Sequence, residues 1–131
     1  MAKVLYDFDY AIVTYFKNYK LLQLEWKKPG TKEEYENIFL KASELPSSLN
    51  IQYFLSDIRK AGVVTIETLK WLKEDIIPIA DKLGITKVGL LLRKDLFSKI
   101  YANSIQAGLE GYRIAFNYFN HRDEAISWFQ F

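Results

Sequence analysis

Cysteine is absent from this chain of 131 residues, and histidine occurs only once, at position 121. Without cysteine the chain forms no disulfide bond, no catalytic thiolate and no cysteine-bound zinc site. A single histidine also excludes a metal site built from several histidines. We therefore expect neither a metal nor a cofactor.

The chain also has little excess charge of either sign. It has 18 basic and 16 acidic residues, which gives a formal net charge of +2. Such a balance gives no long-range field that would attract nucleic acid or an anionic membrane, so we expect no nucleic-acid partner. Apolar runs stay well short of the roughly 20 residues that span a bilayer. The first residues carry one lysine and interspersed acidic residues, unlike a signal peptide. We expect a single cytoplasmic domain over residues 1–131.

Apolar residues, by contrast, are abundant: they make up 50% of the chain, and aromatic residues make up 16%. A disordered chain has few aromatic residues and a high net charge, so this composition predicts a folded domain. At this length a domain buries a substantial core. Most aromatic side chains are expected in that core. Any that gather on one surface would mark a site for a partner or ligand.

Three strand-like segments open the chain. β-branched and aromatic residues dominate residues 4–8 and 10–16, and apolar and polar residues alternate over residues 19–26. Residues 17–19 are expected to turn the second segment back onto the third. The pattern predicts an antiparallel arrangement at the start of the sheet.

Two helices are expected in the middle of the chain. Thr31 and Glu34 have the spacing of a capping box that opens the first, and Pro46 stops it. Thr65 begins the second, which should reach Gly84 with a kink or break near Pro78. Its inward stripe is predicted to consist of Ile66, Leu69, Leu72, Ile76, Ile79, Ala80 and Leu83.

Two more helices are expected towards the C-terminus. The third covers residues 94–106, and Asn120 is predicted to cap the fourth, with Asp123 in its first turn. The residues of the third helix that we expect to face inward are Leu96, Phe97, Ile100, Tyr101 and Ile105.

The later strands alternate with these helices. Residues 51–57 are apolar on both faces, as in a central strand, and residues 86–92 and 112–119 are also predicted strands. Alternation of strand and helix indicates parallel pairing with helical crossovers. We expect an α/β fold with a mixed sheet of about five strands, mostly parallel with an N-terminal antiparallel hairpin, and about four helices.

Several short motifs add a family resemblance. The segment WKKPG covers residues 26–30, Asp57-Ile58-Arg59 ends the central strand, Thr65 and Trp71 mark the next helix, and the chain closes with Phe119, Ala125 and Trp128. In this combination the chain resembles the STAS-like fold of bacterial anti-sigma-factor antagonists and of CRAL-TRIO lipid-carrier-like proteins. More narrowly, it resembles a family of small bacterial STAS-like proteins of unknown function.

The resemblance bears on Thr65. The sigma-factor regulators carry a phosphorylatable serine at the start of the helix that follows the central strand, and Thr65 stands at about that place. A phosphate on a helix N-terminus is stabilised by the backbone amides and the helix dipole. Thr68, expected to be exposed, is a lesser alternative acceptor. Plain capping of the helix is the stronger interpretation of Thr65, because threonine is a preferred capping residue in any case.

Other polar candidates are few. Asp57 and Arg59 follow a central strand, where α/β sheets usually place ligand sites, so they form either an anion-binding or catalytic pair or a local ion pair that fixes the crossover. His121 is either a general base or a solvent-facing residue of a first helical turn. No nucleophile elbow, phosphate-binding loop or zinc pattern accompanies them.

An apolar site is also predicted, near the third helix. Leu96, Phe97, Tyr101 and Tyr112 are expected either to line a cleft between that helix and the sheet or to seal the end of the sheet. These observations support three hypotheses. The first is a non-enzymatic binding or regulatory module that acts through contacts with a protein partner or as a homodimer. The second is a carrier or sensor of a small apolar ligand in that cleft. The third is an enzyme that uses Asp57, Arg59 and His121.

Overall fold

The computed structural model describes residues 2–130, and its centre is one sheet of six strands in sequential order. The first three strands pair antiparallel, and the third to the sixth pair parallel. The predicted mixed α/β fold is therefore confirmed, with one strand more than the five expected. The strands are β1 (Ala2–Asp7), β2 (Ala11–Phe16), β3 (Leu21–Trp26), β4 (Tyr53–Asp57), β5 (Lys87–Leu91) and β6 (Ala115–Phe119).

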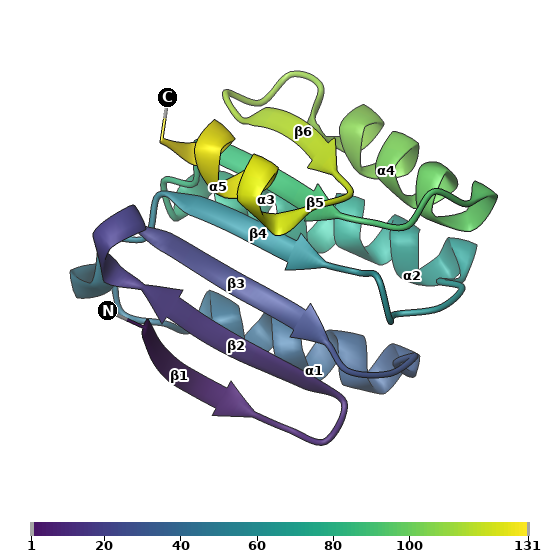
Figure 1. The fold of residues 1–131 in the computed structure, drawn as a ribbon, viewed down its shortest axis with the longest axis horizontal. Coiled ribbons are helices and arrows are strands. Elements are labelled where there is room, and N and C mark those ends of the chain that lie inside the picture. The colour runs from purple at the N-terminus through teal and green to yellow at the C-terminus, as the bar shows by residue number, and fades with distance from the viewer. Residues whose placement is uncertain (1, 131) are drawn as a thin grey trace.

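The helices lie in two layers. Figure 1 shows α5 on the near face of the sheet and the other helices behind it. The helices are α1 (Lys32–Ser43), α2 (Ile66–Trp71), α3 (Ile77–Lys82), α4 (Leu96–Leu109) and α5 (Arg122–Phe129). A π-helical turn over Leu72–Ile76 joins α2 to α3 without a loop, and short 3-10 turns cover Lys17–Tyr19 and Ser47–Leu49. No helix within residues 2–130 is long and apolar enough to cross a membrane.

The predicted irregularity near Pro78 takes the form of that π-helical turn. Proline has no N–H and its ring clashes with the preceding turn, so an ordinary helix cannot pass through it unchanged. Here the N–H of Ile77 donates to the carbonyl oxygen of Leu72, five residues earlier. Pro78 then occupies the start of α3, where its missing N–H is tolerated. The widened turn lets one helical rod continue past the proline.

The expected ends of the first two helices are confirmed. Thr31 and Glu34 form both hydrogen bonds of the capping box. Gly84 has a φ of +87° and follows α3, and the N–H of Ile85 donates to the carbonyl oxygen of Ala80. This left-handed residue with a return hydrogen bond is a common helix terminator, and it favours glycine.

The predicted cap of the last helix is wrong by one residue. α5 begins at Arg122, so His121 is its N-cap, and His121 makes no side-chain capping bond. Asn120 lies outside the helix and donates from Nδ2 to the carbonyl oxygen of Leu92. Asn120 therefore ties the end of β6 to the end of β5 instead of capping α5.

The core has two parts, one on each face of the sheet. On the face of α1 to α4, Trp26 stacks on Tyr35 with ring centroids 4.1 Å apart. On the face of α5, Phe129 packs over Gly89 and Leu55. A Cβ atom at Gly89 would lie 2.9 Å from Cζ of Phe129, so only glycine allows α5 to approach this closely.

The predicted inward faces of two helices are partly wrong. Leu96, Phe97 and Ile100 of α4 are exposed, and so are Ile66 and Leu83 at the two ends of the α2–α3 rod. The buried positions of α4 share a helical spacing, and they are Ser98, Tyr101, Ala102, Ile105 and Leu109. Leu96 and Ile100 lie on the opposite side of the helix from this stripe, so apolar content alone did not identify the side of α4 that faces the core.

Candidate functional site

Asp57 ends β4 and is only 5% exposed, and Arg59 supplies hydrogen-bond donors to its carboxylate. The Nε atom of Arg59 lies 2.9 Å from Oδ1, its terminal guanidinium nitrogen lies 2.7 Å from Oδ2, and its backbone N–H also donates to Oδ1. This is the fork geometry that suits arginine and carboxylate. The hydrogen bonds that the guanidinium donates to Asp57, together with the negative charge of Asp57, raise the pKa of Arg59. Asp57 and Arg59 therefore form a local ion pair that holds the start of the crossover against the end of β4. This geometry agrees with the second of the two interpretations of the pair given above.

Thr65 and Thr68 form one hydrogen-bonded unit at the start of α2. The Thr65 oxygen accepts from the backbone N–H of Thr68, and its hydroxyl donates to the Thr68 side chain. The capping role of Thr65 is thus confirmed. The expected exposure of Thr68 is wrong: it is 3% exposed, because it lies four residues before Leu72 on the same buried side of the helix.

Large exposed apolar side chains occur on the elements beside this crossover. They come from the loop before α2, from the first residue of α2 and from the first two turns of α4, and α2 packs against α4. We call this set the carboxyl-end surface, because it lies beyond the carboxyl ends of β4 and β5. Its members are Val63, Ile66, Leu96, Phe97 and Ile100, with Ile66 86% and Phe97 57% exposed.

Basic residues surround part of this surface. Val63 and Phe97 line a shallow depression of about 240 Å³ together with Arg59, Lys60 and Arg93. Asp95 lines it as well, but its carboxylate accepts a hydrogen bond from the N–H of Ser98 and so caps α4. Asp95 also lies 3.8 Å from Nε of Arg93, and Arg59 is paired with Asp57, so among residues 2–130 only Lys60 of these three cations has no acidic partner. The depression therefore combines exposed apolar side chains with a weakly positive rim.

The apolar residues predicted to share a cleft near α4 do not all meet. Tyr101 is buried in the core, where burial raises the pKa of its phenol. Phe97 and Leu96 point away from that core, and Tyr112 lies beyond the C-terminal end of α4 with a partly exposed ring. Of the binding residues proposed from the sequence, Asp57, Arg59, Thr65 and Phe97 lie at the carboxyl end of the sheet. Their role in binding stays a prediction.

His121 lies apart from Asp57 and Arg59 in the topology. It follows β6, two strands from β4, and it is exposed. Within residues 2–130 there is no group of three or more His, Cys, Asp or Glu side chains that could hold a metal ion.

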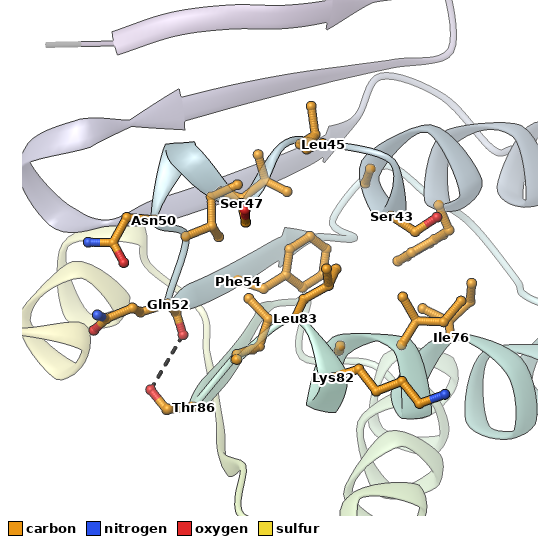
Figure 2. Close-up of a pocket in the computed structure, with 18 of the residues that line it drawn as sticks. Ser43, Leu45, Ser47, Asn50, Gln52, Phe54, Ile76, Lys82, Leu83 and Thr86 are labelled. Atoms are coloured by element: carbon orange, nitrogen blue, oxygen red, sulfur yellow. Dashed lines mark hydrogen bonds between the residues drawn. The ribbon is translucent and has the colours of Figure 1, made fainter.

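A second hollow lies at the opposite end of the parallel strands, between α1 and α3. It has a volume of about 470 Å³, and its walls include Phe39 and Ala42 of α1, Phe54 of β4, and Ile76 and Ile79 of the α2–α3 rod. Figure 2 shows Phe54 and Leu83 between Asn50, Gln52 and Thr86 on one side and Ser43, Ile76 and Lys82 on the other. We call this hollow the α1–α3 pocket.

Sequence reasoning missed the α1–α3 pocket. Its lining comes from two strands, two helices and two connections, and each apolar member looks like an ordinary core residue in its own segment. The one available signal was Pro46 followed by two serines, which ends α1 early and leaves an irregular connection above the sheet.

The fold defines a class of protein. The six-stranded mixed sheet with helical crossovers is STAS-like, so the resemblance seen in the sequence is confirmed at the level of the fold. A solved structure that this chain resembles is an uncharacterized protein of the DUF3478 family, with a SpoIIAA-like fold, from Shewanella loihica PV-4. The TM-score is 0.55 at 15% identity, and the match covers 98% of this chain and 92% of the other. No protein-family model and no curated protein matches the sequence.

Proposed function

We propose that this chain is a non-enzymatic binding module of the bacterial cytoplasm, and that its carboxyl-end surface docks a protein partner. The observation that carries the proposal is the exposure of five large apolar side chains on the elements at the carboxyl end of the sheet, of which Val63 and Phe97 line one depression. Soluble domains seldom expose such a group without a use for it. Aromatic and aliphatic anchors of this kind, with Phe97 and Ile66 the most prominent, supply most of the binding energy in protein interfaces.

The charge around the surface indicates the chemistry of the partner. Lys60, together with the solvent-exposed parts of the paired Arg59 and Arg93 side chains, would meet complementary charge on a partner that presents an apolar segment flanked by Asp or Glu. A second copy docked through the same face would bring like charges together, which opposes self-association there. The partner of this surface is therefore a different protein.

The Asp57–Arg59 pair supports this non-enzymatic proposal. Both oxygens of Asp57 accept hydrogen bonds from Arg59, which leaves the carboxylate poorly placed to act as a general base. The pair and the Thr65 cap would instead hold the loop that presents Val63 and Ile66.

Substitutions that introduce a negative charge on an apolar side chain test the surface. Proteins that co-purify with the chain from its native host should be lost with Phe97→Glu and with Ile66→Glu. They should be retained with Leu40→Glu, which alters a similarly exposed apolar residue on α1. A captured protein must then bind the purified wild-type chain and fail to bind Phe97→Glu. Equal binding to both forms would refute the proposed surface.

We also propose that the chain forms a homodimer through another surface, the sheet face that α5 leaves uncovered. Figure 1 shows α5 over the β4–β6 half of this face, while β1 and β2 lie open. Strand register places Val4 and Phe16 on this side, together with Leu21 and Leu55 of the α5 core. Val4 is exposed and Phe16 is only partly buried, so a second copy would cover apolar area there.

A further inference from the structure

The α1–α3 pocket holds apolar surface that the chain does not cover by itself. Its apolar lining residues include Leu45, Ile51, Phe54, Ile76 and Ile79, and each of these is only partly buried. Such apolar area favours the binding of an apolar molecule, because binding removes the area from contact with water. The volume of about 470 Å³ lies within the range of sites that bind small molecules.

The pocket is independent of the carboxyl-end surface. The C-terminal ends of α1 and α3 and the residues that lead into β4 and β5 form its mouth, so it opens at the amino ends of the parallel strands. Its lining and the lining of the depression beside Phe97 have no residue in common. A ligand here would leave the proposed protein-binding surface unobstructed.

One charge lies in the lining, and it is positive. Lys82 lies in the last turn of α3, and among residues 2–130 it has no ion-pair or hydrogen-bond partner through its side chain. The lining contains no Asp or Glu. The hydroxyl of Ser43, on the same side of the pocket, donates to the carbonyl oxygen of Leu40, so Lys82 is the main donor there. A single ammonium group can pair with a ligand that carries one negative charge. Phosphate groups, by contrast, are usually bound by the bidentate guanidinium of arginine or by several backbone amides.

We propose that the α1–α3 pocket binds a single-chain amphiphile with a terminal carboxylate, such as a fatty acid. The hydrocarbon chain lies against Phe54, Ile76 and Ile79, and the carboxylate pairs with Lys82 at the mouth. The pocket volume accommodates roughly a dozen methylene groups at the packing density of a protein interior. A two-chain lipid would exceed this volume.

Dodecanoate and 1-dodecanol are the test ligands, because they share a twelve-carbon chain and differ in charge. Competition against the neutral dye Nile red at pH 8 gives both affinities. We expect dodecanoate to bind the wild-type chain about tenfold more tightly than 1-dodecanol, with a stoichiometry of one by native mass spectrometry. Lys82→Met should remove that difference and leave the affinity for 1-dodecanol unchanged. Lys99→Met, a change outside the pocket lining, should preserve the difference.

Two filling variants test the location. Ala80→Trp and Ala42→Phe add bulk from opposite walls of the pocket, and each should reduce the affinity for both ligands at least tenfold. Circular dichroism identifies whichever variant stays folded. Equal affinity of the wild-type chain for the two ligands would overturn the assignment of the carboxylate to Lys82 while leaving apolar binding intact. Undetectable binding of both ligands, or full binding by a folded filling variant, would overturn the site itself.

Discussion

Asp57 and Arg59 join a buried carboxylate to a guanidinium whose side chain is 42% exposed. Solvent screens part of their attraction, so the pair should contribute less than a fully buried one. We predict a coupling free energy of about 1 kcal/mol from the double-mutant cycle of Asp57→Ala and Arg59→Ala. Urea unfolding of the four proteins measures it. A coupling indistinguishable from zero would show that the bidentate geometry does not stabilise the crossover.

Gly89 offers a second test at the scale of a residue. A methyl group at this position would press against Phe129, which is buried and cannot move aside without disturbing α5. Gly89→Ala should therefore lower the free energy of unfolding by about 1–3 kcal/mol, although alanine is otherwise preferred to glycine in a strand. The control is the same substitution in a Phe129→Leu background, where the shorter side chain makes room. If Gly89→Ala lowers the free energy of unfolding by the same amount in both backgrounds, the proposed clash with Phe129 is contradicted.

At the scale of an element, the start of α4 determines how Phe97 is presented. The backbone N–H of Ser98 donates to the Asp95 carboxylate, and this hydrogen bond holds the pKa of Asp95 below its usual value. A carboxyl with a lowered folded-state pKa stabilises the fold fully above its unfolded pKa of about 3.9, and this stabilisation is lost as the pH falls through the folded value.

The Asp95 cap therefore gives a prediction with a defined direction in pH. The wild-type chain should have a higher urea midpoint than Asp95→Asn at pH 7, because asparagine caps the helix without the charge that favours its N-terminus. The difference should shrink as the pH is lowered from 7 to about 3. A difference that stays constant over this range would mean that the Asp95 charge contributes nothing to the cap.

The elements themselves could largely be predicted from sequence, because their signals are local. The Thr31–Glu34 capping box, the Thr65 cap and the Gly84 stop depend on residues a few positions apart, and all three are confirmed. Side-chain orientation on α4 could not be read in the same way. It depends on which side of the helix meets the rest of the fold: the buried side carries Ser98 and Ala102, whereas the more hydrophobic Leu96 is exposed.

Sites require contacts between distant segments, and they were correspondingly harder to predict. The Asp57–Arg59 pair was visible because its members are two residues apart. The α1–α3 pocket was not visible, because Phe39, Phe54 and Ile79 approach one another only after two crossovers have been placed. Of the residues predicted to line a cleft near α4, Tyr101 is buried and Tyr112 is exposed, a difference that the sequence pattern did not reveal.

At the scale of the whole molecule, the proposed homodimer has a simple test. Sedimentation velocity of the wild-type chain should give twice the mass of 15.4 kDa, and Val4→Lys should shift the chain towards the monomer by placing a charge on the open sheet face. Leu40→Lys, on the opposite face of the sheet, serves as the control. A wild-type chain that remains monomeric at high concentration would contradict the dimer.

The central claim is that the carboxyl-end surface docks a different protein, and photo-crosslinking in the native host tests it most directly. A benzophenone amino acid would replace Phe97 in one form and Leu40 in a second, matched form, since both side chains are exposed. The account predicts that irradiation at position 97 gives one discrete adduct with another protein, which position 40 does not give. An adduct of two copies of this chain, identical adducts from both positions, or no adduct from position 97 would contradict it.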